Sequence, residues 1–381
     1  MKRFVWVLTV LLVVTMLPLE ANAVDMDIPA KSALLMDVAT GTVLYEQEAH
    51  TALAPASVTK VMTMLLIMEA IDDGRIRWED TVTASEEAAA KGGSQIFLKA
   101  GETMSAADMV KSIAVSSAND CACAMAEHIA GSEAGFVNMM NDRAKELGMN
   151  DTHFVNCTGL DDDPNAKEHL TSAYDIALMS RELLKNHPDI KKYTTIWMDT
   201  VRNGSFGLSN TNKMVRFYNG ATGLKTGFTS AAGYCLSASA QRDDLELIAV
   251  VMGCETSQKR FSACKSLLDH GFANYALITP EQDTTYSVPV KMGKQEFVSA
   301  VPAQNDALLI DKAQRNTVNI QVELEELVSA PVSKGQRLGT MTVRSGEQIL
   351  AQIPMVAEEA VEKLSFWDIF RLLFKQTIGA K

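Results

Sequence analysis

The segment that most limits the folds open to this chain runs from residue 57 to residue 71, and it is apolar around nearly its whole helical circumference. Its large apolar side chains are Val61, Met62, Met64, Leu65, Leu66 and Met68. A helix that is hydrophobic on every side is stable inside a core and not on a surface. Asp72-Asp73-Gly74 marks its end. We therefore expect this helix to lie in the core of a domain.

Strand patterns flank a helical middle region. The predicted hairpins span residues 31–47 and 233–253, and the predicted helices lie at about 105–130, 134–147 and 171–186. This order predicts an α/β (α+β) domain with one sheet that takes outer strands from distant parts of the chain and is covered by helices. Residues 278–358 show short alternating runs and turn signals, which predict a separate small all-β domain.

The first 23 residues predict a signal peptide. Lys2 and Arg3 precede a continuous apolar stretch, and Ala21-Asn22-Ala23 has the small-x-small pattern of a cleavage site. The alternative is an uncleaved anchor helix, but the apolar run is short for a membrane span. We therefore expect the protein to be exported and to work at the outer face of the cytoplasmic membrane.

The last segment, residues 359–381, predicts an amphipathic helix. Phe366, Phe370 and Leu373 recur at helical spacing, while Asp368 and Arg371 fall on the opposite face. Dense aromatic residues at a terminus favour a helix that lies in a membrane interface. Packing on the β domain and a dimer contact are the alternatives. Charges interrupt the segment too often for it to span a bilayer.

Composition excludes two classes of site. The formal net charge is −12 and no run of Lys or Arg occurs, so nucleic acid is not an expected partner. The six histidines are scattered and the six cysteines lack the spacing of zinc ligands. No metal or other cofactor is indicated, and most of the cysteines are interpreted as small buried hydrophobes.

Ser57 and Lys60 are the first candidates for chemistry. The Ser-x-x-Lys spacing places both on one face of a helix, one turn apart. Serine at a helix start is commonly only a cap. A lysine that opens a buried helix, however, has its pKa lowered by desolvation, which makes it a base for the serine hydroxyl. A second such string, Ser262 to Lys265, is interpreted as chance.

Two further strings follow. Ser117-Ala118-Asn119 lies between helical stretches, where serine and asparagine are also common as caps or loop residues. Lys225-Thr226-Gly227 precedes the second hairpin and could be only a strand edge with a glycine bulge. As functional groups, they supply a proton-shuttling hydroxyl, an amide, and a cationic strand for a substrate carboxylate. Together with the first string they form a complete set for acyl transfer through serine.

These three strings, in this order, resemble the signature of penicillin-binding proteins and class A β-lactamases. The mature chain as a whole resembles the low-molecular-mass D-alanyl-D-alanine carboxypeptidases of bacterial cell-wall metabolism. The other strings that carry the resemblance lie at residues 93–98, 232–234 and 331–335. The resemblance implies a β-lactamase/transpeptidase-like catalytic domain over residues 24–277, with an antiparallel sheet, followed by the β domain and a membrane-anchor helix.

The resemblance also implies a mechanism. Ser57 attacks the carbonyl between the two terminal D-alanines of a peptidoglycan stem peptide, Lys60 accepts its proton, and Ser117 helps to return a proton to the leaving amine. The backbone N–H groups of Ser57 and Phe228 form the oxyanion hole. Many members of the family have histidine at the position of Phe228, so a role for that side chain in deacylation is absent here.

The binding roles follow from the same resemblance. Asn119 positions the peptide, Lys225 and Thr226 hold the terminal carboxylate, and Gly227 lets the peptide lie close to the strand. β-Lactam antibiotics are expected to inhibit the enzyme. A β-lactamase, a transpeptidase and a non-catalytic penicillin sensor are the competing interpretations. The string 182–186 lacks one residue of the class A deacylation pattern, and the extra β domain also argues against a lactamase.

Overall fold

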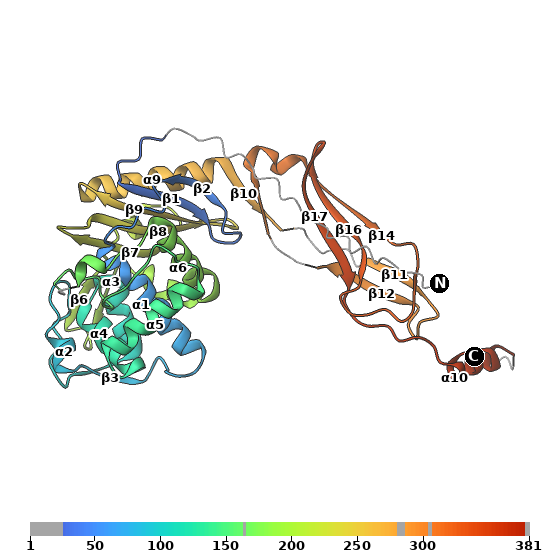
Figure 1. Cartoon of the computed structure of the whole chain (residues 1–381), viewed down its shortest axis with the longest axis horizontal. Coiled ribbons are helices and arrows are strands. Elements are labelled where there is room, and N and C mark those ends of the chain that lie inside the picture. The colour runs from blue at the N-terminus through green and yellow to red at the C-terminus, as the bar shows by residue number, and fades with distance from the viewer. Residues whose placement is uncertain (1–25, 163–164, 280–285, 304–306, 378–381) are drawn as a thin grey trace, which may run out of the picture.

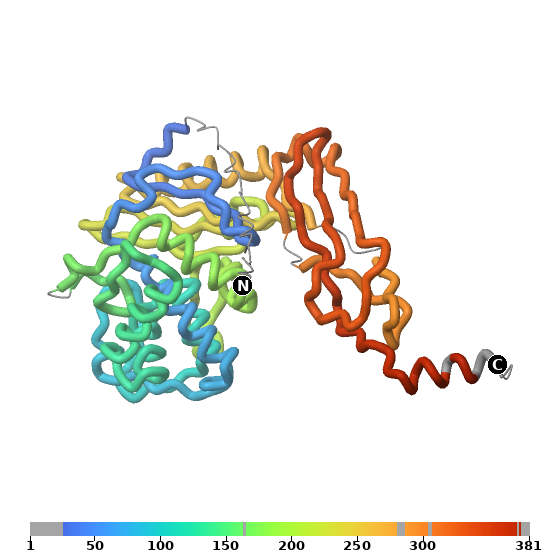
Figure 2. Tube along the Cα trace, turned by 45° about the vertical axis from the view of Figure 1, so that its right-hand side comes forward, coloured from blue at the N-terminus to red at the C-terminus, as the bar shows by residue number. Residues whose placement is uncertain are grey.

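The computed structural model describes residues 26–162, 165–279, 286–303 and 307–377. The predicted signal peptide, with its cleavage site at Ala21-Asn22-Ala23, lies outside the described residues. Within them, no helix combines the length and the apolar character needed to cross a bilayer. Two bodies are visible, joined near the last helix of the larger one, with a short helix projecting from the smaller (Figure 1, Figure 2).

The described residues of the larger body form strands β1 to β9 and helices α1 to α9. Its strands are β1 (Ser32–Asp37), β2 (Val43–Gln47), β3 (Thr81–Thr83), β4 (Thr103–Ser105), β5 (Met198–Val201), β6 (Phe206–Ser209), β7 (Ala221–Thr229), β8 (Gly233–Arg242) and β9 (Leu245–Cys254). Its helices are α1 (Lys60–Asp72), α2 (Glu86–Ala89), α3 (Ala106–Ser116), α4 (Asn119–Ala130), α5 (Glu133–Glu146), α6 (Ala173–Asn186), α7 (Lys191–Thr194), α8 (Met214–Phe217) and α9 (Ser257–Asn274). Short 3-10 turns accompany them: η1 (Ala56–Thr59), η2 (Ala166–Glu168) and η3 (Pro188–Ile190).

Five of these strands form one antiparallel sheet in the order β2-β1-β9-β8-β7. The N-terminal hairpin therefore pairs with β9, which comes from far along the chain, and this confirms the predicted arrangement. Strand β7 is at one edge, so one side of its backbone has no strand partner in this sheet. Figure 1 shows α9 on one face of the sheet and the other long helices on the opposite face.

Alternation along the strands divides the core into two layers. In β9, Ile248, Val250 and Met252 pack with the helical layer that contains α1. The residues between them, Leu247, Ala249 and Val251, pack under α9. Because both faces of the sheet are covered, the strand reads as a continuous apolar run. Helix α1 is buried along nearly its full length, as its sequence predicted.

Helix α9 was not among the predicted elements. Its spacing of Cys264, Leu267, Leu268 and Gly271 is that of an amphipathic helix, and these residues face the sheet. Gly271 lets the helix pack closely on the sheet, since a Cβ atom at this position would lie 2.4 Å from Leu247 Cδ1. The predicted helix near residues 105–130 is two helices, α3 and α4, which are separated at Ser117 and Ala118.

The smaller body confirms the predicted all-β domain. Its elements are β10 (Tyr275–Ile278), β11 (Tyr286–Lys291), β12 (Phe297–Pro302), β13 (Leu308–Asp311), η4 (Lys312–Thr317), β14 (Val318–Leu324), β15 (Val328–Ser329), β16 (Arg337–Ser345) and β17 (Gln348–Ala357). Six strands form one sheet in the order β14-β16-β17-β12-β11-β15. Val288, Val298 and Met341 belong to its own hydrophobic core. Strand β10 continues from α9 and pairs with β13, which links the two bodies.

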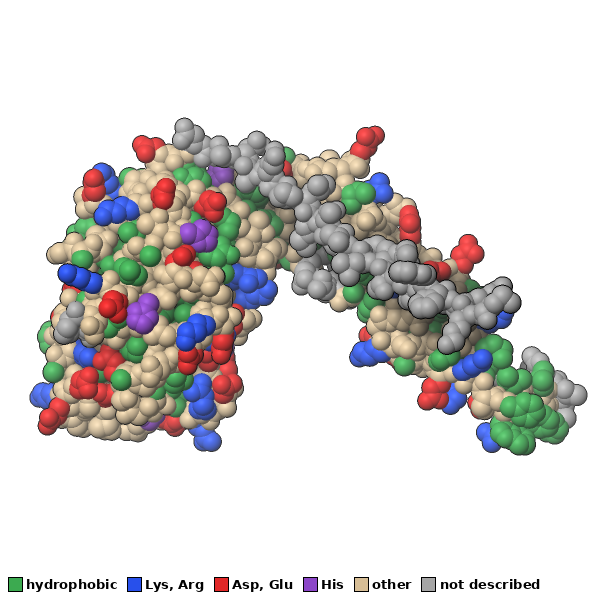
Figure 3. Space-filling view, in the orientation of Figure 1, with side chains coloured by type: hydrophobic (Ala, Val, Ile, Leu, Met, Phe, Trp, Pro, Cys, Tyr) green, Lys and Arg blue, Asp and Glu red, His purple; other side chains and the backbone are tan. Residues whose placement is uncertain are grey.

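The terminal helix α10 spans Phe366–Thr377 and begins later than its sequence pattern suggested. Val361 is still part of the β domain, where it pairs with Val332. Ser365 starts the helix because its hydroxyl accepts a hydrogen bond from the N–H of Asp368 and donates one to the carboxylate of that residue. The helix projects away from the β domain, and its apolar side chains are exposed (Figure 3).

Candidate active site

Ser57 and Lys60 meet where the chain enters the central helix. Ser57 lies in the 3-10 turn η1, and Lys60 is the first residue of α1. Lys60 Nζ lies 2.9 Å from Ser57 Oγ, within hydrogen-bond distance. The preceding residue, Ala56, has a φ of 49°, a left-handed conformation that alanine rarely adopts. The predicted nucleophile and base are therefore in contact, in a locally strained turn.

Burial changes the protonation of Lys60. Its side chain is fully buried, and its second hydrogen-bond partner is the carbonyl of Thr158 at 2.7 Å. Burial lowers the pKa of Lys60 from 10.5 to about 7, although Cys157 and Asp120 act in the opposite direction. A lysine with this pKa is substantially uncharged near neutral pH, so its lone pair can take the hydroxyl proton.

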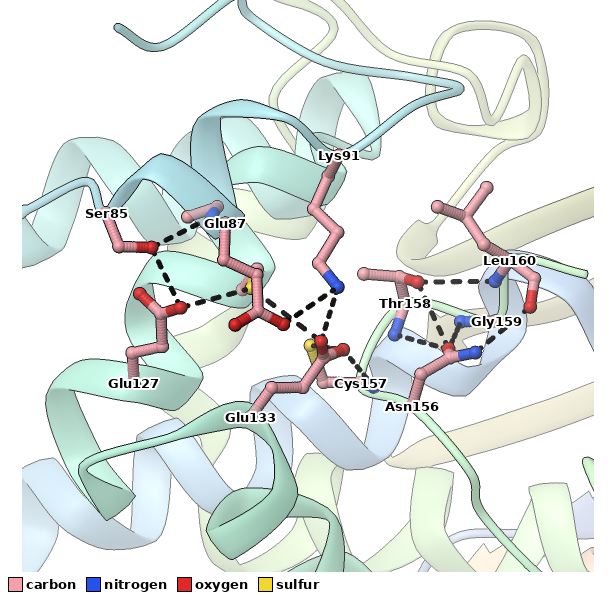
Figure 4. Close-up of polar contacts among 12 residues, drawn as sticks. Ser85, Glu87, Lys91, Glu127, Glu133, Asn156, Cys157, Thr158, Gly159 and Leu160 are labelled. Carbon is pink, nitrogen blue, oxygen red and sulfur yellow. Dashed lines mark hydrogen bonds and ion pairs between the residues drawn. The ribbon is translucent and has the colours of Figure 1, made fainter. Parts of the chain in front are cut away.

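The loop that holds Thr158 is fixed on both sides. Asn156 Oδ1 accepts hydrogen bonds from the N–H groups of Thr158 and Gly159, and its amide donates to the carbonyl of Leu160 (Figure 4). Gly159 has a φ of +79°, and a Cβ atom there would lie 1.9 Å from the carbonyl oxygen of Ala56. The loop therefore lies directly against the turn η1, which carries Ser57, and only glycine permits this approach.

Behind this loop lies a polar cluster. The thiol and the N–H of Cys157 donate to the carboxylate of Glu133, which forms an ion pair with Lys91 (Figure 4). Glu87, Cys123 and Glu133 could in principle hold a metal, since their ligand atoms lie within 4.8 Å of one another. The Lys91 ammonium, however, already supplies the positive charge for Glu133 and Glu87. The ion pairs of Lys91 hold Glu133 in place, and Glu133 in turn binds Cys157 of the loop.

The second motif lies at the break between α3 and α4. Ser117 ends α3 with a φ of 64°, and its hydroxyl is buried without a hydrogen-bond partner within the described part of the chain. An unpaired buried hydroxyl is unfavourable unless a ligand or a reaction uses it. Ser117 Oγ is therefore available to form a hydrogen bond with a bound ligand.

Asn119 is fixed by the loop that was noted at residues 93–98. Its N–H donates to the carbonyl of Ser94, and its side-chain amide donates to the carbonyl of Gly92 at 2.8 Å. Asn119 Oδ1 is buried and has no donor among the described residues. The next residue, Asp120, holds the same loop through the N–H groups of Ile96 and Leu98. Sequence reasoning missed Asp120, although it lies directly beside the motif.

The third motif is on the edge strand β7. Lys225 is buried, and its amine donates to the carbonyl of Thr226 at 2.9 Å. Burial lowers the pKa of Lys225 well below its usual value, and the positive charges of Lys60 and Arg260 add to this effect. Thr226 Oγ1 donates to Thr211 Oγ1 at 2.7 Å. The N–H of Thr211 in turn donates to the carbonyl of Val115 in α3, which links the second and third motifs.

Gly227 brings the third motif against the first. A Cβ atom on Gly227 would lie 2.6 Å from the carbonyl oxygen of Pro55 and 3.1 Å from the backbone nitrogen of Ser57. A side chain at this position would therefore separate the strand from the nucleophile. Phe228, the next residue, is half exposed, and its ring packs on Tyr234 with a centroid distance of 4.3 Å.

Comparisons with known proteins agree with this geometry. A family model described as D-alanyl-D-alanine carboxypeptidase matches residues 19–256, and one described as penicillin-binding protein 5, C-terminal domain, matches residues 275–363. The chain is 44% identical over 356 residues to the D-alanyl-D-alanine carboxypeptidase DacF of Bacillus subtilis, covering 92% of this chain and 89% of that protein. It is 33% identical to DacC of Escherichia coli, covering 95% and 91% of the two chains.

Solved structures show the same relationship. Penicillin-binding protein 5 from Haemophilus influenzae superimposes with a TM-score of 0.77 at 30% identity, and covers 90% of this chain and 100% of that one. Penicillin-binding protein D2 from Listeria monocytogenes, solved in its ampicillin-bound form, gives a TM-score of 0.58 at 32% identity over 65% of this chain and 99% of its own. The chain therefore belongs to the D-alanyl-D-alanine carboxypeptidases, a family of serine-type hydrolases, and carries the C-terminal domain of penicillin-binding protein 5.

Proposed function

We propose that the protein removes the terminal D-alanine from peptidoglycan stem pentapeptides through an acyl-enzyme on Ser57. The observation that carries this proposal is the contact of Lys60 with Ser57 at 2.9 Å, in a site where burial brings the pKa of Lys60 to about 7. A neutral amine against a serine hydroxyl is the arrangement that activates a nucleophile without histidine.

In the first step, Ser57 Oγ attacks the carbonyl carbon of the penultimate D-alanine. Lys60 takes the hydroxyl proton, and the negative charge that develops on the carbonyl oxygen is held by the N–H groups of Ser57 and Phe228. The C–N bond then breaks, and the leaving amine receives a proton by way of Ser117, whose hydroxyl has no other partner in the described structure. The products are free D-alanine and an ester on Ser57.

In the second step, water attacks the ester and Lys60 accepts the proton of that water. The Ser57–acyl bond breaks, and Ser57 regains its proton. Phe228 contributes only its backbone N–H to either step. Asn119 Oδ1, which has no donor within the described part of the chain, is free to accept a hydrogen bond from a substrate N–H.

Lys225 and Thr226 bind the substrate carboxylate in this proposal. Without substrate, the pKa of Lys225 is held well below its usual value by burial and by neighbouring positive charges. A bound carboxylate supplies the missing counter-charge and favours the ammonium form. A peptide without a free carboxylate cannot do so, and the proposal therefore predicts a preference for a free chain end.

The direct test uses the mature protein and a peptide that ends in Lys-D-Ala-D-Ala. We expect release of one D-alanine for each peptide, measured by a coupled D-amino-acid oxidase assay, and saturable labelling by a fluorescent penicillin. Labelling without release identifies a penicillin sensor. Rapid penicillin hydrolysis with no peptide cleavage identifies a β-lactamase. Transfer of the peptide to an added amine, in preference to water, identifies a transpeptidase. Each of these three results contradicts the proposal.

We further propose that α10 holds the exported protein at a membrane surface. Phe366, Trp367, Phe370, Leu373 and Phe374 are each at least half exposed. The aromatic side chains follow one another along the helix, with ring centroids about 6 Å apart. An apolar helix face that projects from its domain is suited to the boundary between headgroups and acyl chains.

Removal of residues 365–381 is expected to release the protein from membranes. This truncation leaves Val361 paired with Val332, so the β domain keeps its own core. The measurement is co-sedimentation with liposomes, accompanied by the D-alanine assay. We expect at least a tenfold loss of bound protein, because each buried aromatic side chain contributes about 1.5–3 kcal/mol. Undiminished membrane binding contradicts the anchor. A change from dimer to monomer in sedimentation velocity supports a dimer contact instead.

A further inference from the structure

Arg260 is a buried cation beside the active site, and it takes no part in the proposed reaction steps. It lies in the first turn of α9 and is 6% exposed. Its guanidinium lies over the rings of Phe261 and Tyr234, at 4.7 Å and 5.4 Å from their centroids. In the described part of the chain it has no carboxylate within ion-pair distance. A buried charge without a counter-ion is costly, so stability alone does not account for an arginine at this position.

Arg260 donates from Nη2 to Ser257 Oγ in its own helix and from Nη1 to two carbonyls of the sheet, one of them in the third motif. Its Nη1 donates to the carbonyl of Gly227 at 3.0 Å and to that of Cys235 at 3.3 Å. Gly227 and Cys235 are opposite each other in the β7–β8 pair. Arg260 therefore binds the edge strand β7 at Gly227, the residue that lies against the turn of Ser57.

The carbonyl of Gly227 and the N–H of Phe228 belong to one peptide unit. This unit is trans, so its C=O and N–H point in opposite directions. Arg260 Nη1 also binds the carbonyl of Cys235 on β8, which places the Gly227 carbonyl toward β8 and directs the N–H of Phe228 away from β8. The 3-10 turn η1 lies against the same stretch of β7, since a Cβ atom on Gly227 would lie 3.1 Å from Ser57 N.

We propose that Arg260 is the positioning residue of the oxyanion hole: its guanidinium orients and polarises the Gly227–Phe228 peptide unit so that the Phe228 N–H binds the developing oxyanion. This inference rests on the proposed function. A positive charge on the carbonyl side withdraws electron density from the amide and makes its N–H a stronger donor. The same guanidinium contacts Tyr234, on which Phe228 packs, so it also fixes the next side chain.

The test compares variants that differ in charge and in donor capacity. Arg260→Met removes both, Arg260→Gln keeps a neutral donor, and Arg260→Lys keeps the charge. Arg242→Met is the matched control, because Arg242 also lies over two aromatic rings, Tyr218 and Phe272, but far from the motif residues in contact with Arg260. Circular dichroism and melting temperature establish that each variant is folded.

Three readouts separate positioning from general support. For Arg260→Met we expect kcat to fall about 10- to 100-fold with less than a threefold change in KM, a smaller loss than that of an oxyanion donor itself. A D-alanine-type boronic acid, whose adduct carries the tetrahedral negative charge, should lose affinity by a similar factor. In the penicilloyl-enzyme, infrared spectroscopy should show the ester carbonyl at higher frequency. Arg260→Lys should recover most of each effect, and Arg260→Gln less.

The possible failures are distinguishable. If the wild type releases no D-alanine, the proposed function fails. If the wild type is active and a folded Arg260→Met or Arg260→Gln retains wild-type boronate affinity and ester frequency, only the role of Arg260 is overturned. If Arg260→Met does not fold, the Gln and Lys pair gives the same decision. Equal losses in Arg242→Met also contradict the assignment.

Discussion

Ser57→Ala is expected to abolish D-alanine release and penicillin labelling together. Loss of a nucleophile from a serine hydrolase costs on the order of 10⁴- to 10⁶-fold in rate, because no other group forms the covalent intermediate. The hydroxyl makes one described side-chain contact, with Lys60, so its removal leaves the packing of the turn in place. The measurements are D-alanine release, covalent labelling and melting temperature.

The chain offers its own control for this variant. Ser262 and Lys265 repeat the Ser-x-x-Lys spacing in α9, but both are exposed on the helix surface. Ser262→Ala should be as active as the wild type. A folded Ser57→Ala that still forms a stable penicillin adduct shows that another residue is the nucleophile, and the assignment of the site is then wrong.

Lys60→Met should produce the second largest loss, on the order of 10³-fold or more, because it removes the proposed base while filling the same space. The wild-type acylation rate should rise with pH through about 7, since the ammonium form below that value cannot accept a proton. The Lys60→Met variant should lack this rise. Lys265→Met is the matched control and should keep both the rate and the pH profile.

Lys60→Met, which should lower activity, is expected to raise the stability of the fold. The pKa of Lys60 is about 7 in the folded protein, against 10.5 for an ordinary solvated lysine, so the unfolded chain binds a proton that the folded one lacks between these values. The stability of the wild type therefore rises with pH across this window. Lys60→Met should melt at a higher temperature than the wild type at pH 7, and the difference in melting temperature should narrow towards the upper end of the window.

The acylation rate is the readout that decides the role of Lys60 as a base. A wild-type acylation rate that does not change with pH on either side of 7 contradicts the base assignment.

Much of the architecture follows from local patterns in the sequence. The all-apolar segment predicts the central helix because it has no polar face. The two hairpins on either side of a helical region predict one sheet whose outer strands come from distant parts of the chain. The contact of Ser57 with Lys60 also follows from spacing, since residues one helical turn apart lie on the same face. These features depend on neighbours in the sequence.

The other parts of the site depend on contacts between distant residues. Thr158 acts through its carbonyl, which every residue has, so no side-chain pattern marks it. Arg260 lies within an amphipathic helix, and only the folded structure shows that it reaches Gly227. The left-handed conformation of Ser117, which is not glycine, is likewise invisible in the sequence. The start of α10 was misplaced because Val361 belongs to a β-bridge with Val332.

The central position of β9 in the sheet also determines how much of the chain must be present before the sheet can form. Leu35 pairs with Ala249, so the N-terminal hairpin has no stable place until the chain is complete to that strand. Non-local pairings of this kind slow folding, because the loop between them must be closed before they contribute. The turn that carries Ser57 also lies against Gly227 of β7, so this contact needs the chain beyond residue 227. We therefore expect the site proposed for acyl transfer to assemble only after most of the polypeptide has been made, so that an unfinished chain does not react with substrates or antibiotics.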